Sequence, residues 1–93
     1  MNFVWSEEKA IANLKKHGVS FEEAKTVFRD WNAVRIYDPD HSADEDRFVL
    51  LGLSTEYRLL VVCHCYRDND ECVRIISARK ATKTESATYE EGK

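Results

Sequence analysis

Residues 73–82, with the sequence VRIISARKAT, constrain the fold more than any other stretch of the chain. Their valine and isoleucines favour a buried strand, because β-branched side chains are stiff and pack well on a pleated sheet. Thr82, followed three residues later by Glu85, is the pattern of a capping box that begins a helix. A strand therefore runs directly into a helix, and Arg79 and Lys80 lie at the junction.

Alternation along this strand predicts that each face carries apolar side chains and ends with a cation. One face is expected to carry Val73, Ile75, Ser77 and Arg79, and the other Arg74, Ile76, Ala78 and Lys80, unless the strand bends near Ser77. Cations beside the free N–H groups of a helix start suit an anion such as a phosphate. The alternative is a solvated strand end whose cations pair with acidic side chains nearby, and this stretch alone does not decide between the two.

Length and composition predict one domain over residues 1–93, in a reducing cytoplasm. Of the 93 residues 43% are hydrophobic, and one proline and three glycines leave no evident linker. No apolar run approaches the roughly 18 residues needed to span a bilayer, and the first residues lack the layout of a signal peptide. Three cysteines, an odd number, argue against a disulfide framework.

The charge is acidic overall but unevenly distributed along the chain. Residues 1–46 hold six Lys/Arg and ten Asp/Glu, a net −4, whereas residues 47–93 hold eight and seven, a net +1, which together give −3. Four cations and no acid lie between residues 73 and 84. Long-range attraction to nucleic acid is not expected from such a chain, so any contact with RNA must use a local basic site.

Hydrophobic periodicity and turn residues predict elements in the order α-α-β-β-β-β-α. The expected helices span residues 7–16, 20–30 and 82–91, and the expected strands span residues 33–37, 47–53, 57–66 and 73–80. Short loops make neighbouring strands antiparallel. The prediction is an α+β domain with two N-terminal helices, a four-stranded antiparallel sheet and a C-terminal helix.

Capping residues support both N-terminal helices. Ser6 suits the start of the first helix and Gly18 its left-handed end, and Ser20 with Glu23 forms a second capping-box pattern. The sides that face the core are expected to carry Ala10, Ile11 and Leu14 in the first helix and Phe21, Ala24, Val27 and Phe28 in the second.

Two long stretches at opposite ends of the chain resemble the signatures of one known family. Residues 13–24, NLKKHGVSFEEA, resemble the N-terminal signature of the BrnT-type toxins of bacterial toxin–antitoxin pairs. Residues 74–82, RIISARKAT, with Glu85 and Tyr89 behind them, resemble the C-terminal signature. A third, weaker patch lies in residues 41–47, where HS is followed by a glutamate and an arginine.

The resemblance implies a RelE-like fold and a metal-independent ribonuclease that halts translation. It also implies neutralisation by a cognate, BrnA-like antitoxin that binds DNA, so that toxin and antitoxin form a hetero-oligomer. RNA is then the substrate, and neither a metal ion nor an organic cofactor is expected.

Cleavage of RNA without a metal ion needs a base for the 2′-hydroxyl, cations for the charged phosphorane and an acid for the leaving oxygen. Because arginine stays protonated, it suits the second role best. The candidates for that role are Arg47, Arg67, Arg79 and Lys80. The candidates for proton transfer are His17, His41, His64 and Glu45, of which His64 and Glu45 are preferred. The candidates for binding RNA are Arg74, Lys83 and Tyr89.

Each candidate also has a purely structural interpretation. The cations can form weak surface ion pairs, His64 can be a partly buried histidine with a hydrogen-bonded ring, and Tyr89 can pack the last helix. Two rival functions remain open. One is an inactive binding module of the same fold, and the other is a zinc site on Cys63, Cys65 and Cys72, although the C-x-C spacing favours small core residues instead.

Overall fold

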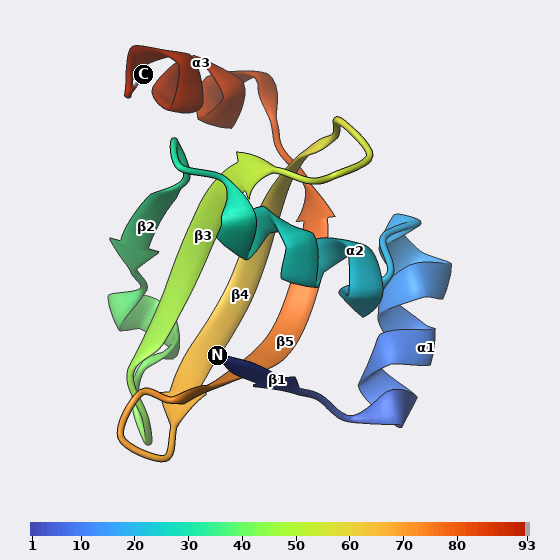
Figure 1. Cartoon of the computed structure of the whole chain (residues 1–93), viewed down its shortest axis with the longest axis vertical. Helices are drawn as coiled ribbons and strands as arrows, with labels where there is room; N and C mark the ends of the chain where they lie inside the picture. The colour runs from blue at the N-terminus through green and yellow to red at the C-terminus, as the bar shows by residue number, and fades with distance from the viewer. Residues whose placement is uncertain (93) are drawn as a thin grey trace.

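A five-stranded mixed sheet forms the centre of the protein, with strand order β1-β5-β4-β3-β2 (Figure 1). The structure is a computed structural model and describes residues 1–92. The strands are β1 (Asn2–Val4), β2 (Val34–Tyr37), β3 (Arg47–Leu53), β4 (Leu59–Arg67) and β5 (Cys72–Lys80). The helices are α1 (Glu7–His17), α2 (Phe21–Thr26) and α3 (Lys83–Glu91), with short 3-10 turns at Val27–Arg29 and Pro39–His41. The α+β class is therefore confirmed.

The expected four-stranded antiparallel sheet is wrong in one respect. Residues Asn2–Val4 form an additional strand that pairs in parallel with β5, Val4 lying opposite Arg74. The other three pairings are antiparallel, as expected. A strand of three residues is too short to show a period-2 pattern, and only its partner at the far end of the sequence defines it.

An extra residue in β5 changes which side chains share a face. Cys63 of β4 pairs with Ser77, but the next residue pairs with Ile75, so Ile76 is a bulge without a partner. Arg74 lies opposite Cys65 and Arg79 opposite Val61. Because Val61 and Cys65 are four residues apart on one strand, Arg74 and Arg79 lie on the same face. The simple alternation expected for residues 73–80 is therefore wrong beyond the bulge.

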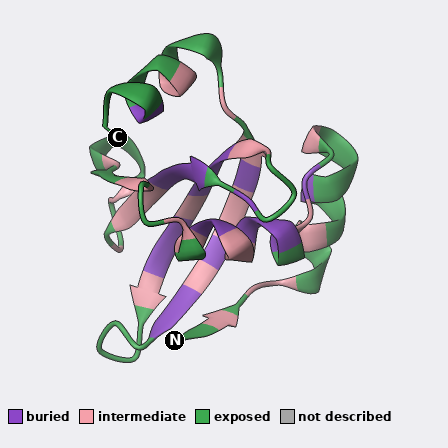
Figure 2. Cartoon of the chain, turned by 45° about the horizontal axis from the view of Figure 1, so that its top comes forward, coloured by how far each residue is buried: buried purple, intermediate pink, exposed green. Residues whose placement is uncertain are grey.

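The helices α1 and α2 cover one face of the sheet and bury most of the core there (Figures 1 and 2). The buried apolar side chains from α2 and the turn that follows it are Phe21, Ala24 and Val27, as expected, and the polar Glu23 is buried as well. In α1, however, Ile11 and Leu14 are 68% and 51% exposed. Ala10 packs against the core as expected, and the buried residue of α1 is the polar Asn13, so the expected apolar side of this helix is wrong for Ile11 and Leu14.

Asn13 hydrogen-bonds the edge of β5 that β1 does not cover. Its side-chain amide donates to the carbonyls of Ala78 at 2.8 Å and Val19 at 3.0 Å, and its oxygen accepts from the N–H of Ala78 at 3.1 Å. β1 pairs only with the first residues of β5. Asn13 thus supplies the donor and acceptor that a neighbouring strand would otherwise provide.

α3 packs against one end of the opposite face. Tyr89 is 3% exposed, clusters with Leu51 and Val61, and donates its hydroxyl to Oδ2 of Asp30 at 2.6 Å. Burial raises the pKa of Tyr89 to about 12. A side chain held in this way cannot stack on an RNA base, so the expected RNA-binding role of Tyr89 does not fit its position. We call the rest of this face, which bears Arg47, Arg67, Arg74 and Arg79, the open face.

The expected capping boxes behave differently from each other. At the start of α3, Thr82 and Glu85 form a complete capping box. At the start of α2, Ser20 accepts from the N–H of Glu23, but the Glu23 carboxylate binds Arg58 and Ser54 instead.

Among residues 1–92, no helix is long and apolar enough to cross a membrane.

Replacing Asn13 with alanine is expected to lower the free energy of unfolding by about 2–4 kcal/mol, because two backbone groups of Ala78 lose their buried partners. Urea denaturation would measure the change. Asn2→Ala is the matched control, since Asn2 is exposed, and should change the stability by less than about 0.5 kcal/mol. Similar stabilities for the two variants would contradict this role of Asn13.

Candidate active site on the open sheet face

Four arginines share the open face because of strand register. Arg47, Cys65 and Arg74 lie side by side on β3, β4 and β5, and Arg67 lies opposite Cys72. Arg79 joins them from beyond the bulge. In Figure 1 this face points away from the viewer, behind the sheet that α2 crosses.

The central part of the open face forms a hollow of about 280 Å³. Arg47 reaches it from β3, Arg79 from β5, and His41 from the loop between β2 and β3. The other lining residues are Asp38, Val49, Val61, Cys63, Ile76 and Ser77. The hollow therefore combines two guanidinium groups and an imidazole above an apolar floor.

His41 forms a pair with a carboxylate beside this hollow. Its Nδ1 lies 2.8 Å from Oδ2 of Asp38, and 68% of its side chain is exposed. Ser42 attaches the loop to β3, because its hydroxyl accepts from the N–H of Arg47 and donates to the carbonyl of Asp38. Since Nδ1 is engaged, Nε2 of His41 is the nitrogen left for proton transfer. The sequence favours His64 over His41 for proton transfer. The feature that points to His41 is the HS pattern at residues 41–42, which belongs to the weaker patch of family resemblance.

Arg79 is held by a carboxylate from the capping box. Its two terminal nitrogens donate to the two oxygens of Glu85 at 2.8 and 2.9 Å. Oε1 of Glu85 also accepts from the N–H of Thr82 at 2.8 Å. The Arg79 guanidinium, followed by the Thr82 backbone, lowers the pKa of Glu85 to about 2, against the opposing effect of burial. Arg79 is consequently fixed in position and partly neutralised.

Glu45 bridges two further arginines. Its oxygens lie 3.2 Å from Nη2 of Arg67 and 3.7 Å from Nη2 of Arg47. Within residues 1–92, the buried Nε of Arg47 has no hydrogen-bond partner. The expected role of Glu45 in proton transfer is therefore less favoured than a role in positioning arginines, and Arg47 keeps an unused donor.

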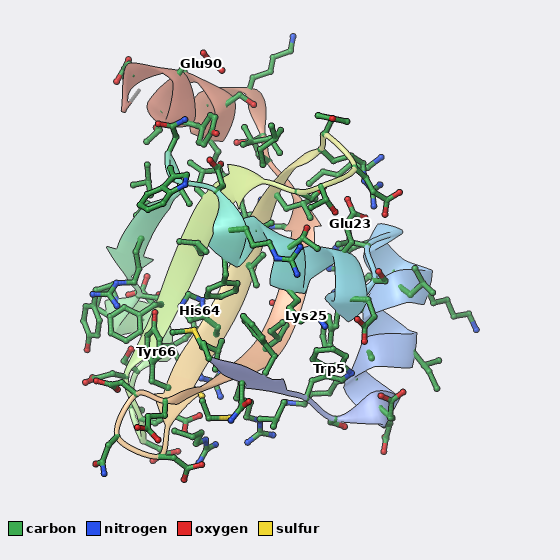
Figure 3. All side chains as sticks on the ribbon, viewed as in Figure 1. Trp5, Glu23, Lys25, His64, Tyr66 and Glu90 are labelled. Carbon is green, nitrogen blue, oxygen red and sulfur yellow. The ribbon has the colours of Figure 1, made fainter. Side chains whose placement is uncertain are left out.

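His64 does not fit the catalytic role expected for it. It is fully buried on the helix-covered face, packed against Phe28 and Phe48. Nδ1 lies 3.0 Å from the carbonyl of Val62 and Nε2 lies 3.2 Å from the hydroxyl of Tyr66 (Figure 3). Burial lowers the pKa of His64, which favours a neutral ring. It is a core residue without access to substrate.

Two further candidates lie away from the hollow. Lys80 pairs with Leu60, which places it on the face opposite Arg79. Its charge acts instead on Glu23, whose pKa is lowered mainly by Arg58 and slightly by Lys80. Lys83 is exposed at the first turn of α3. The expected grouping of Lys80 with the arginines is therefore wrong, because consecutive residues of a strand point to opposite faces and Lys80 directly follows Arg79.

The cysteines are free thiols. Cys63 lies in the floor of the hollow, and burial raises the pKa of its thiol. Cys65 and Cys72 are buried. Among residues 1–92 there is no group of three or more His, Cys, Asp and Glu side chains arranged to hold a metal ion.

Comparison with known proteins decides the family. Residues 5–85 match the family described as the ribonuclease toxin BrnT of type II toxin–antitoxin systems. The chain belongs to the BrnT family. It is also similar to the crystal structure of the ribonuclease toxin BrnT from Brucella abortus, with a TM-score of 0.66 and 25% identity over 89% of this chain and 99% of that one. Comparison with curated protein sequences finds no match.

The expectation of a BrnT-type ribonuclease toxin is thus confirmed, and membership of a type II family implies an antitoxin partner. The comparisons assign no role to individual residues of this BrnT-family chain. Of the residues expected to carry the chemistry, the structure brings Arg47 and Arg79 to one hollow and places Arg67 beside a second one.

The Arg79–Glu85 pair predicts a specific loss of stability in acid. Because the pKa of Glu85 falls from 4.5 to about 2 on folding, the stabilisation is complete above the unfolded value and is lost as the pH falls toward the folded value. Between about pH 5 and pH 2, the wild type should lose about 1–2 kcal/mol more than Glu85→Gln, after allowance for solvent screening. Glutamine can still form the capping box. Parallel pH profiles from urea denaturation would contradict the prediction.

Proposed function

We propose that this BrnT-family ribonuclease cleaves RNA without a metal ion, in the hollow between Arg47 and Arg79. The observation that carries the proposal is the convergence of these two guanidiniums with the His41–Asp38 pair on one face. Cations for the phosphorane and a group for proton transfer are the parts that such a reaction requires.

His41 is the proposed general base. Its Nε2 takes the proton of the 2′-hydroxyl while Asp38 holds Nδ1 and stabilises the imidazolium that forms. The 2′-oxygen attacks the adjacent phosphorus and the bond to the 5′-oxygen breaks, which leaves a 2′,3′-cyclic phosphate. Solvent water protonates the departing 5′-oxygen. Arg47 and Arg79 stabilise the additional negative charge on the phosphorane.

The paired arginines can still bind a phosphate. A guanidinium has five N–H donors, and Arg79 uses only some of them on Glu85. The buried Nε of Arg47 has no partner within residues 1–92. Because carboxylates offset much of the local positive charge, binding depends on short-range hydrogen bonds. The net charge of −3 agrees with that requirement.

The open face is also the proposed surface for the antitoxin. The family implies such a partner, and we propose that it is BrnA-like, binds DNA and forms a hetero-oligomer with this chain in the cytoplasm. A partner that covers the hollow would exclude RNA from Arg47 and Arg79 directly. Neutralisation then requires no change in the toxin's own fold.

Arg47→Ala is expected to lower kcat/KM for RNA cleavage by about a hundredfold or more, because one of the two proposed phosphorane ligands is lost. A fluorogenic RNA assay with purified full-length protein would measure it. Arg29→Ala is the matched control, since Arg29 is exposed beside α2 on the other side of the sheet, and should retain full activity. Full activity in folded Arg47→Ala would place the reaction elsewhere, and no cleavage by the folded wild type would support an inactive binding module.

His41→Gln is expected to lower kcat by about 10²–10⁴-fold, the usual contribution of a general base. The melting temperature should hardly change, because His41 is exposed. Asp38→Asn should cause a smaller loss, since it weakens only the orientation of the ring. His17→Gln, at the end of α1, is the control. Activity that survives in His41→Gln, or that EDTA abolishes in the wild type, would contradict the proposed mechanism.

A further inference from the structure

A second hollow lies on the open face, next to the proposed active site. It has a volume of about 470 Å³ and lies where β1, the end of β4 and the start of β5 meet. Its lining includes Arg67, Arg74, Asp68 and Trp5. None of its lining residues belongs to the hollow between Arg47 and Arg79.

Arg74 is the arginine of the open face that is free to bind a ligand. Among residues 1–92 it has no hydrogen bond or ion pair to another side chain, whereas Arg47, Arg67 and Arg79 each pair with a glutamate. Arg67 is engaged by Glu45 at 3.2 Å, and its side chain is 42% exposed. A phosphate in this hollow would therefore have Arg74 as its main ligand and Arg67 as a second one.

The two hollows are placed to contact one strand of RNA. Arg47 and Arg74 flank Cys65 on adjacent strands, so their Cα atoms are about 10 Å apart, twice the spacing between strands. Both side chains project from the same face. A polyanion that lies over Arg47 therefore reaches Arg74 within a few nucleotides.

Trp5 lies at the edge of the second hollow, where its side chain also packs against the core under α1 and α2. Its ring packs edge-on against Phe21, with the centroids 5.9 Å apart, and its Nε1 donates to Glu7 at 3.1 Å. The ring is half-buried and lies beside β1 (Figure 3). Bases of single-stranded nucleic acid stack on such rings with little sequence preference.

We propose that this second hollow binds a nucleotide that flanks the cleaved bond, with Arg74 and Arg67 on its phosphate and Trp5 against its base. The proposal rests on the proposed function, since it places the substrate on the face that bears Arg47. It makes Arg67 and Arg74 substrate-binding residues and leaves the chemistry to the first hollow. Because the carboxylate of Asp68 is negatively charged, we expect the hollow to hold one phosphate and not a second one.

Kinetics with substrates of two lengths test the proposal. Arg74→Ala is expected to raise KM about tenfold for an RNA that extends several nucleotides on both sides of the cleaved bond, with kcat unchanged. A dinucleotide cannot reach the second hollow, so its kcat/KM should stay the same. Arg74→Lys should recover part of the loss, because it keeps the charge but not the planar fork. Arg29→Ala is the control.

Tryptophan fluorescence gives a direct readout of stacking. The chain has two tryptophans, and Trp31 is 99% exposed, so Trp31→Phe leaves Trp5 as the single emitter without disturbing the core. A 2′-O-methyl RNA lacks the attacking hydroxyl and stays intact during titration. We expect this RNA to quench the fluorescence of Trp5. The Arg74→Ala variant should require an RNA concentration about tenfold higher for the same quenching.

Three results would overturn the proposal. One is an unchanged KM for the long RNA, including the case in which Arg74→Ala weakens only binding of the antitoxin. Another is a loss of kcat on the dinucleotide, which would make Arg74 part of the chemistry. The third is RNA binding without quenching of Trp5. Failure of the proposed function is a separate result, because Arg47→Ala would then stay active whatever Arg74→Ala does.

Discussion

The bulge at Ile76 is the constraint on which the open face depends. In a regular strand, Arg74 and Arg79 would point to opposite sides of the sheet, and one guanidinium would lie under α1 and α2. Burying an unpaired cation there would cost several kcal/mol. The extra residue moves both arginines to the same face, and the hydrogen bonds from Asn13 to Ala78 hold β5 immediately after it. The part of β5 under the helices is left with the apolar side chains of Val73, Ile75 and Ala78.

The charged side chains of this molecule act mainly over short distances, through ion pairs. Glu45 and Glu85 are the carboxylates that hold these arginines. Glu45 links the loop before β3 to the end of β4, and Glu85 links α3 to the strand that precedes it. Glu85 does this while it caps α3, so the start of that helix and the position of Arg79 are set together. In the proposed site, a phosphate shares these guanidiniums with the protein's own acids. Fit to the hollow then contributes more to recognition than attraction at a distance.

Local signals were sufficient for most of the fold. The N-caps at Ser6, Ser20 and Thr82 and the left-handed Gly18 bound the helices as expected, because capping depends on a few neighbouring residues. What could not be predicted depends on partners far along the chain. β1 exists because β5 is beside it, and Ile76 bulges because of the β4 register.

In the candidate site, too, the residue types could be predicted from the sequence, but the features that depend on distant partners could not. Residue type and strand ends predict a group of Arg47, Arg67, Arg79 and Lys80, with Arg74 as a separate RNA-binding candidate. The bulge puts Arg74 in the place of Lys80 in that group, and the sequence indicates it only as a bend near Ser77. The sequence places His41 in an acidic loop and His64 in an apolar strand, but it does not show that the packed sheet buries His64 fully or that the loop brings His41 to Asp38 and Arg47. Asn13 was overlooked because a polar residue between apolar ones looks solvent-exposed, whereas its amide completes a strand edge.

The parallel pairing of β1 with β5 also affects how the protein is made. Asn2 lies opposite Cys72, so β1 can pair only after β5 has been synthesised. Contacts between such distant residues form late, because closing a long loop is entropically costly. Arg74 and Arg79 are on that last strand as well. A nascent chain on the ribosome therefore has no complete arginine surface until β5 has been synthesised.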